Sequence, residues 1–314
     1  MDSPAVTLST VGDQLARQPA ILGSFLSEPL PEAPQGSLFV GAGDSYVASS
    51  IASYLSSMKC QALDPYELTS SRGVAKGRTA YFVTVSGDTS SNVTAARAAK
   101  GIAKRSVAIT ANAKGKIVGV VDEMIFIPCE YIPRLPGTLS FSLSLLALLK
   151  LACGQFKCDL TSVSSRARRD AKKLLFSDEG TTYFLGNSAA FPVGQYSALK
   201  MHELLGARAQ AEMLEEFNHA PLFSLRKHDA VNIFCALDPL HIGQKLATAL
   251  RIGGFNANAI TPFGSNPFEQ VFYFIFLSQF AVLQRAKSEG HSRPYFAGAK
   301  GKLGVSDSMI YGGI

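Results

Sequence analysis

The sequence contains no tryptophan, and only 17% of its 314 residues are charged, against 47% that are hydrophobic. This balance excludes a disordered chain, because disorder goes with low hydrophobicity and high charge. No run of Lys and Arg is interleaved with aromatic residues, and no zinc-finger or homeodomain spacing is present. The net charge of +6 is diffuse, so it favours small anionic ligands and does not indicate nucleic acid as a partner.

Long hydrophobic runs are also missing. Residues 1–23 lack a basic segment followed by an apolar core, so we expect no signal peptide. The longest apolar runs, 143–149 and 271–283, are too short to cross a bilayer and are typical of buried helices. We therefore expect a cytoplasmic protein without a membrane partner.

Cysteine is scarce, and no two cysteines have the CxxC spacing of a zinc site. The five cysteines are scattered at Cys60, Cys129, Cys153, Cys158 and Cys235. We expect them to be reduced, as in a cytosolic protein, and we expect no bound metal.

What the sequence does contain is an alternation of short apolar strands and helices, which predicts an α/β fold with parallel sheets covered by helices on both faces. Strands are expected at 37–43, 61–68, 79–83, 106–110 and 124–128, and again at 183–188, 210–214, 230–237 and 257–261. Helices are expected between them, the longest at 139–151, 189–206 and 267–288. The pattern weakens around 154–164, so we expect two domains, 1–158 and 159–314.

One polar turn is richer in hydroxyl groups than the others. The segment Thr84-Val85-Ser86-Gly87-Asp88-Thr89 follows an apolar strand and precedes an Ala-rich helix. The start of a helix attracts an anion, hydroxyl groups donate hydrogen bonds, and Gly87 lets the backbone come close. The turn therefore suits a phosphate monoester. An ordinary helix cap is the alternative, since capping selects the same residue types.

A second turn has a similar form. Residues 41–46 read Gly-Ala-Gly-Asp-Ser-Tyr, so the third glycine of a dinucleotide-binding GxGxxG motif is missing. In the second half of the chain, the turn 237–240 has no cluster of hydroxyl groups. This asymmetry favours a single phosphate pocket per chain, although the two halves look like diverged copies of one α/β unit.

These motifs resemble those of the sugar isomerase (SIS) domain family, in tandem. The resemblance is greatest to the isomerase half of glucosamine-6-phosphate synthase and extends to archaeal phosphoglucose/phosphomannose isomerases. It implies two tandem SIS domains, each a flavodoxin-like three-layer sandwich. It also implies that the sugar phosphate is held by the family's turns, which here contain Gly43, Ser45, Thr84, Ser86, Gly87, Thr89, Arg134 and Thr138.

The second half contains the family's catalytic motifs. Residues 199–203, Leu-Lys-Met-His-Glu, resemble Leu-Lys-x-x-Glu, which makes Glu203 the expected base and Lys200 its neighbour. Residues 215–221, Glu-Glu-Phe-Asn-His-Ala-Pro, resemble Glu-x-x-His-Gly-Pro, whose histidine opens the sugar ring, so His219 is the counterpart. The resemblance further implies a homodimer in which His219 reaches the neighbouring subunit's pocket. Lys300, or alternatively Lys302, matches a lysine of the family's C-terminal tail.

Residue chemistry alone leaves alternatives open. Lys200 and Glu203 are three residues apart, which is also the spacing of a surface ion pair. Read with the resemblance, the sequence predicts a hexose-6-phosphate aldose–ketose isomerase that uses acid–base groups and needs no cofactor. A glucosamine-6-phosphate deaminase and a non-catalytic sugar-phosphate sensor are the other two readings.

Overall fold

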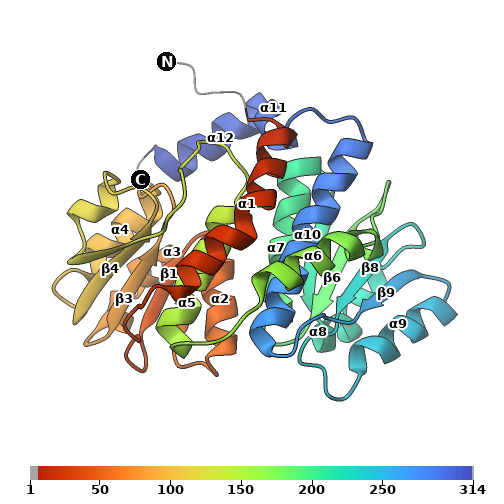
Figure 1. Ribbon diagram of the computed structural model, residues 1–314, viewed down its shortest axis with the longest axis horizontal. Coiled ribbons are helices and arrows are strands. Elements are labelled where there is room, and N and C mark those ends of the chain that lie inside the picture. Colours follow the sequence, from red (N-terminus) through yellow and green to blue (C-terminus); the bar gives the residue numbers. More distant parts are fainter. Residues whose placement is uncertain (1–5, 313–314) are drawn as a thin grey trace. The chain divides into compact units, whose positions relative to one another are not determined.

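The computed structural model describes residues 6–312 and divides the chain into two compact units. The first unit comprises Ala20–Lys157 together with the tail from Ala299 onward, and the second comprises residues 6–19 and Cys158–Gly298 (Figure 1). The division at 157/158 lies beside the expected boundary. The ends of the chain depart from the expected division: residues 6–19 belong to the second unit, and the tail belongs to the first.

The first unit contains a five-stranded parallel sheet in the order β2-β1-β3-β4-β5. Its strands are β1 (Leu38–Gly41), β2 (Gln61–Leu63), β3 (Thr79–Val83), β4 (Arg105–Thr110) and β5 (Glu123–Phe126). Its α-helices are α2 (Asp44–Leu55), α3 (Pro65–Ser70), α4 (Ser90–Ala99), α5 (Leu139–Cys153) and α12 (Lys300–Tyr311), and two of its short 3-10 turns are η1 (Arg72–Ala75) and η2 (Lys116–Gly119).

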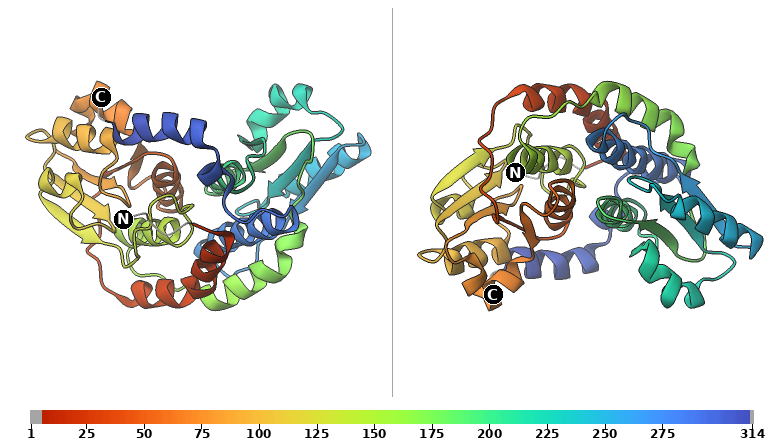
Figure 2. Two further views of the ribbon diagram at one scale, coloured as in Figure 1. Left: turned by 90° about the horizontal axis from the view of Figure 1, so that it is seen from above. Right: turned by 90° about the horizontal axis from the view of Figure 1, so that it is seen from below.

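Helices cover both faces of this sheet. Leu38, Val40 and Phe82 point toward the face covered by α3 and α4, where they form a buried core with Leu68 and Val93. Helices α2 and α5 pack against each other on the opposite face (Figure 2). The alternation follows from the period of two along a strand, which sends successive side chains to opposite faces.

The second unit contains a four-stranded parallel sheet in the order β7-β6-β8-β9. Its strands are β6 (Thr182–Gly186), β7 (Ala209–Met213), β8 (Ala230–Phe234) and β9 (Asn256–Ile260). Its α-helices are α6 (Leu160–Asp170), α7 (Ala190–Leu205), α8 (Leu214–His219), α9 (Ile242–Ile252), α10 (Pro267–Ser288) and α11 (Tyr295–Gly298), and its 3-10 turns are η3 (Ala171–Lys173) and η4 (Pro221–Ser224). Helix α1 (Leu8–Ser27) contributes residues to both units.

This sheet is also sandwiched between two helical layers. Leu185 and Ile233 join Phe217 of α8 and Leu250 of α9 in one core. On the opposite face Phe234 stacks on Phe274 of α10, with ring centroids 4.4 Å apart. The strand order of the second unit repeats the order β2-β1-β3-β4 of the first unit. Both sheets are parallel and covered by helices on both faces, so the expected α/β class is confirmed.

One sequence expectation about the elements is wrong. The strand expected over 61–68 ends at Leu63, because Asp64 accepts a hydrogen bond from the N–H of Tyr66 at 2.8 Å and begins α3, with Pro65 in the first turn. The Gly-rich tail, to which the sequence pattern assigned no element, forms α12. The helix expected over 267–288 matches α10.

Candidate functional site

The hydroxyl-rich turn lies at the carboxyl end of β3, where it leads into α4. Gly87 has φ of +72° and is buried, and a Cβ on it would lie 2.8 Å from the Cα of Gly115. The N–H of Ile117 donates to the carbonyl of Gly87 at 3.0 Å. The backbone therefore approaches a neighbouring loop at a distance that only glycine allows.

Hydrogen bonds within the turn fix its side chains. The hydroxyls of Thr84 and Thr89 lie 3.2 Å apart, and Ser86 Oγ accepts from the N–H of Asp88 at 3.2 Å. Asp88 Oδ1 accepts from the N–H of Lys116 at 2.9 Å, so its carboxylate is engaged with η2. Three hydroxyl groups thus gather at the start of α4, while the carboxylate is held by another segment.

The second predicted turn lies beside the first. Strands β1 and β3 are parallel neighbours, with Gly41 opposite Val83, so the turns that follow them leave the same edge of the sheet. From β1 the chain adds β2 on one side of the sheet and then β3, β4 and β5 on the other, so the switch point lies between β1 and β3. Open α/β sheets bind ligands at such a switch point. Gly43 is exposed with φ of +56°, and a Cβ on Gly41 would lie 2.7 Å from the Cβ of Ser45. The structure thereby brings the Gly43–Ser45 and Thr84–Thr89 turns to one switch point.

The corresponding place in the second unit is filled by a carboxylate of the protein itself. Asp238, which follows β8, accepts hydrogen bonds from the N–H groups of Ile242 at 2.9 Å and Gly243 at 2.8 Å. These are N–H groups of the first turn of α9, which attract an anion. The sequence indicated only that this turn lacks hydroxyl groups; in the structure, Asp238 occupies the first N–H groups of α9.

Arg134 and Thr138 lie on the segment before α5. Arg134 has φ of +62° and forms an ion pair with Asp307 of α12 at 3.3 Å. Its side chain is exposed, whereas Thr138 is buried at the start of α5. The tail helix α12 also contacts α4, and Tyr131 forms a hydrogen bond with Tyr311, where burial and the Tyr311 hydroxyl raise the pKa of Tyr131. Lys300 is the exposed first residue of α12.

Lys200 and Glu203 form the ion pair that their spacing predicts, but in an unusual setting. Lys200 Nζ lies 2.5 Å from Glu203 Oε2 on α7, and the lysine is 1% exposed. The Glu203 side chain is 30% exposed. An ammonium group is rarely buried unless it is paired, because leaving water is costly. The pair is therefore not the solvated surface contact that the spacing alone would allow.

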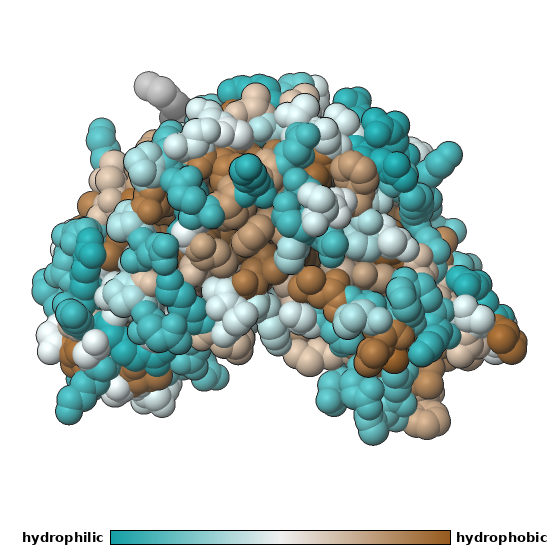
Figure 3. Space-filling view, turned by 60° about the horizontal axis from the view of Figure 1, so that its bottom comes forward, coloured by the Kyte–Doolittle hydropathy of each residue, from teal (hydrophilic) through white to brown (hydrophobic). Residues whose placement is uncertain are grey.

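His219 is the last residue of α8, and its environment is open. Its side chain is 71% exposed, and its Nε2 lies 3.3 Å from Glu215 Oε1, one turn earlier. Phe223 on the following turn η4 is 85% exposed. Other exposed apolar side chains include Val305, Met309 and Ile310 of α12. In the view of Figure 3, hydrophilic residues cover much of the surface, with patches of apolar residues between them.

The sequence analysis missed one polar residue near the hydroxyl-rich turn. Asn92 lies in the first turn of α4 and is 1% exposed, and its Oδ1 has no hydrogen-bond partner among the described residues. The available signal was a single polar residue on a helix face otherwise made of Val and Ala. Buried polar atoms normally have a partner, so this oxygen is a candidate acceptor for a ligand hydroxyl.

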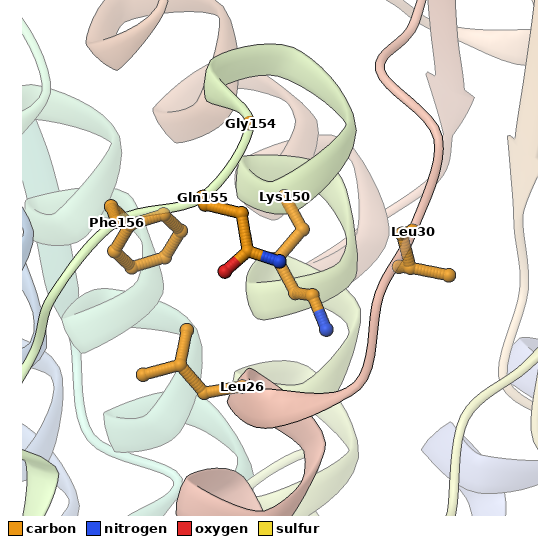
Figure 4. Close-up of a pocket in the computed structure, with 6 residues that line it drawn as sticks. All are labelled: Leu26, Leu30, Lys150, Gly154, Gln155 and Phe156. Atoms are coloured by element: carbon orange, nitrogen blue, oxygen red, sulfur yellow. The ribbon is translucent and has the colours of Figure 1, made fainter.

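A small pocket elsewhere in the first unit has a structural role. Its lining consists of Leu26, Leu30, Lys150, Gly154, Gln155 and Phe156 (Figure 4). Lys150 Nζ donates to the carbonyls of Phe25, at 2.5 Å, and Glu28, and burial lowers the pKa of Lys150. The ammonium group thus satisfies carbonyls at the end of α1.

All five cysteines are free thiols. Within residues 6–312, no group of His, Cys, Asp and Glu could hold a metal ion. Over the same residues no helix has the length and hydrophobicity needed to cross a membrane.

Comparison with known proteins identifies relatives in sequence and in fold. No family model matches the chain. Over 252 residues it is 28% identical to the glutamine–fructose-6-phosphate aminotransferase (isomerizing) of Pseudomonas aeruginosa, a match that covers 70% of this chain. The chain spans 41% of the length of that relative.

Two solved structures share the fold. The glucosamine-6-phosphate deaminase of Thermotoga maritima has a TM-score of 0.70 at 22% identity, covering 91% of this chain and 95% of that one. The tagatose-6-phosphate ketose/aldose isomerase of Escherichia coli has a TM-score of 0.74 at 16% identity, covering 93% and 97%. The chain thus has an α/β fold shared with enzymes that act on phosphosugars.

Proposed function

We propose that this chain is a phosphosugar aldose–ketose isomerase that acts on a hexose-6-phosphate. The observation that supports the proposal most strongly is the buried ammonium of Lys200, 2.5 Å from the half-buried carboxylate of Glu203. A partly desolvated carboxylate is a suitable base for removing a proton beside a carbonyl. The similarity to proteins named for fructose-6-phosphate, glucosamine-6-phosphate and tagatose-6-phosphate supports the same substrate class.

In the proposed reaction, the hydroxyls of Ser45, Thr84, Ser86 and Thr89 bind the phosphate. His219 donates a proton to the ring oxygen and accepts one from the O1 hydroxyl, which opens the ring. Glu203 then takes the proton from C2 and returns it to C1, while a proton moves from the O2 hydroxyl to O1. The intermediate is a cis-enediolate, whose negative charge Lys200 stabilises. Lys300 is proposed to close the site from the tail.

The exposed position of His219 supports the proposed dimer. A ring-opening acid that is 71% exposed must be enclosed by another surface to work away from water, and a second copy of the chain supplies one. The exposed Phe223, four residues later, is an apolar contact suited to such an interface. We propose that His219 acts in the partner's pocket.

The second candidate is a glucosamine-6-phosphate deaminase, which the similarity to the Thermotoga maritima enzyme favours. That reaction also begins with proton transfer at C2 and then releases ammonia. A panel of hexose-6-phosphates and amino sugar phosphates, read for product and ammonia together, separates the two. The isomerase predicts a ketose phosphate without ammonia, and no turnover of any sugar phosphate would leave a sensor as the remaining reading.

Variants identify the residues involved. Glu203→Gln removes the base but keeps the side chain's shape, so it should lower turnover by about 10²-fold or more. His219→Ala should slow reaction of the ring form more than that of an open-chain analogue. If both variants turn over at the wild-type rate, the proposed roles are wrong.

A further inference from the structure

We propose that Tyr196 is a positioning residue that holds the Lys200 ammonium against Glu203. The proposal rests on the proposed function of that pair, and it adds a residue outside the motifs that predicted the pair. Tyr196 lies one turn before Lys200 on α7, and Lys200 Nζ is 5.1 Å from the centroid of its ring. The electron-rich face of an aromatic ring attracts an ammonium group, more strongly when both are out of water.

The hydroxyl of Tyr196 is the end of a chain of hydrogen bonds that runs through two other helices. Its hydroxyl accepts from Gln279 Nε2 of α10 at 2.8 Å, and Gln279 Oε1 accepts from Gln18 Nε2 of α1 at 2.8 Å. All three side chains are at most 2% exposed. Buried polar chains of this kind hold one arrangement, because a broken link leaves an unsatisfied group.

A second buried hydrogen bond joins α7 to α10 beside the first. Ser197 Oγ on α7 and Ser278 Oγ on α10 lie 2.7 Å apart, and each residue is next in sequence to a member of the first contact. Helices α7 and α10 are thus joined by two adjacent buried hydrogen bonds. The position of the Tyr196 ring relative to the second unit's core is therefore determined by both helices.

The consequence concerns the geometry of Lys200. A lysine side chain has several rotatable bonds, so an ion pair alone leaves the ammonium free to move with the carboxylate. A fixed ring beneath the ammonium restricts it to one side of Glu203. The carboxylate then keeps a constant orientation during proton transfer, which affects the rate of the chemical step more than substrate binding.

Three variants test the inference. Tyr196→Leu removes the ring, and Tyr196→Phe keeps the ring but removes its bond to Gln279. Tyr273→Phe is the matched control, because Tyr273 is also a fully buried tyrosine of the second unit, and its hydroxyl donates to Asp170 at 2.8 Å. Loss of a buried hydroxyl in general would affect both Phe variants equally.

Two readouts are expected to agree. With a hexose-6-phosphate that the wild-type protein isomerises, Tyr196→Leu should lower kcat by 10- to 100-fold and change KM by less than threefold. Tyr196→Phe should give a smaller loss in kcat, and Tyr273→Phe none. Should Tyr196→Leu not fold, the comparison of the two Phe variants decides. Equal kcat values for them, or a wild-type kcat in Tyr196→Leu, would overturn the proposal.

Nuclear magnetic resonance separates this inference from the proposed function. The ring current of Tyr196 should shift the ε-CH₂ protons of Lys200 upfield, and the carboxyl carbon of Glu203 should move when the ring is removed. Assignment uses Lys200→Arg and Glu203→Gln. If no sugar phosphate is turned over but both signals move in Tyr196→Leu alone, the proposed function fails and the positioning stands. Unchanged signals in Tyr196→Leu would reject the positioning whatever the activity.

Discussion

Lys200 Nζ lies 2.5 Å from Glu203 Oε2, and the ammonium group is almost completely buried while the carboxylate is partly open to solvent. An ion pair of this kind adds little net stability, because taking the ammonium out of water offsets the attraction. The proposed role of the pair in catalysis therefore does not depend on a contribution to stability.

The first prediction follows from this contrast. Lys200→Met keeps a side chain of similar length but removes the charge. The free energy of unfolding should change by less than about 1 kcal/mol, since Glu203 can be solvated and the cost of burying the ammonium is also removed. The value of kcat should fall by about 10²- to 10³-fold, because charge stabilisation of the enediolate is lost. A stable variant with wild-type kcat would contradict the role of Lys200.

The second prediction concerns the close approach of Gly87 and Gly115. Gly87→Ala adds a Cβ 2.8 Å from the Cα of Gly115 at a residue with φ of +72°. It should lower the free energy of unfolding by about 2–5 kcal/mol, as a left-handed conformation and a steric clash combine. Gly101→Ala is the control, because Gly101 has φ of +77° and nothing within 4 Å of an added Cβ. Denaturant unfolding should show only about 1–2 kcal/mol for the control, and equal losses would refute the clash.

The third prediction tests whether Asp238 fills an anion site. Asp238→Ala should lower the free energy of unfolding by about 1 kcal/mol, since the N–H groups of Ile242 and Gly243 lose their acceptor. Inorganic phosphate should then stabilise the variant more than the wild-type protein, because an anion can replace the carboxylate. Thermal unfolding across a phosphate series measures this. Equal stabilisation of the two proteins would argue against it.

The fourth prediction is a pH dependence of stability. Burial acts to raise the pKa of Asp170, but hydrogen bonds from Arg166, Lys173 and Tyr273 outweigh it and lower the pKa to about 2. A depressed folded-state pKa gives stability that is present above the unfolded value and is lost as pH falls toward the folded value. Between pH 5 and pH 2, the wild-type protein should therefore lose about 2 kcal/mol that Asp170→Asn does not lose. Parallel curves for the two proteins would show that Asp170 has an ordinary pKa.

Local patterns in the sequence predicted much of the fold. The apolar strand at 79–83 and the long helix at 267–288 agree with β3 and α10 because both have strong periodicity and clear boundaries. The strand expected over 61–68 was predicted too long, because Asp64 and Pro65 begin a helix. Two residues are too short a pattern to stand out within an apolar run. The tail helix α12 was missed because its glycines weaken the helical pattern and no residue of it is buried.

The candidate site was predictable only in part. Motifs identified the hydroxyl turns, Lys200 and Glu203 as candidates, but not their surroundings. The contact of Tyr196 with Gln279 joins residues 83 positions apart, and that of Gln18 with Gln279 joins residues 261 positions apart. No local pattern encodes such pairs, since they depend on how α1, α7 and α10 pack. The sequence did not predict that Asp238 binds the first N–H groups of α9, because a carboxylate in a turn is typical of any polar loop.

Hydrogen exchange at the sugar carbons tests whether Glu203 is the base of an aldose–ketose isomerase. Fructose-6-phosphate and glucose-6-phosphate are incubated with the protein in deuterated water, and nuclear magnetic resonance reads deuterium at C1 of the ketose and C2 of the aldose. Because the Glu203 side chain is 30% exposed, the proton that it removes exchanges with solvent before transfer to the neighbouring carbon. We therefore expect deuterium at both positions with the wild-type protein and none with Glu203→Gln. Isomerisation that proceeds equally well in Glu203→Gln, with the same deuterium incorporation, would contradict it.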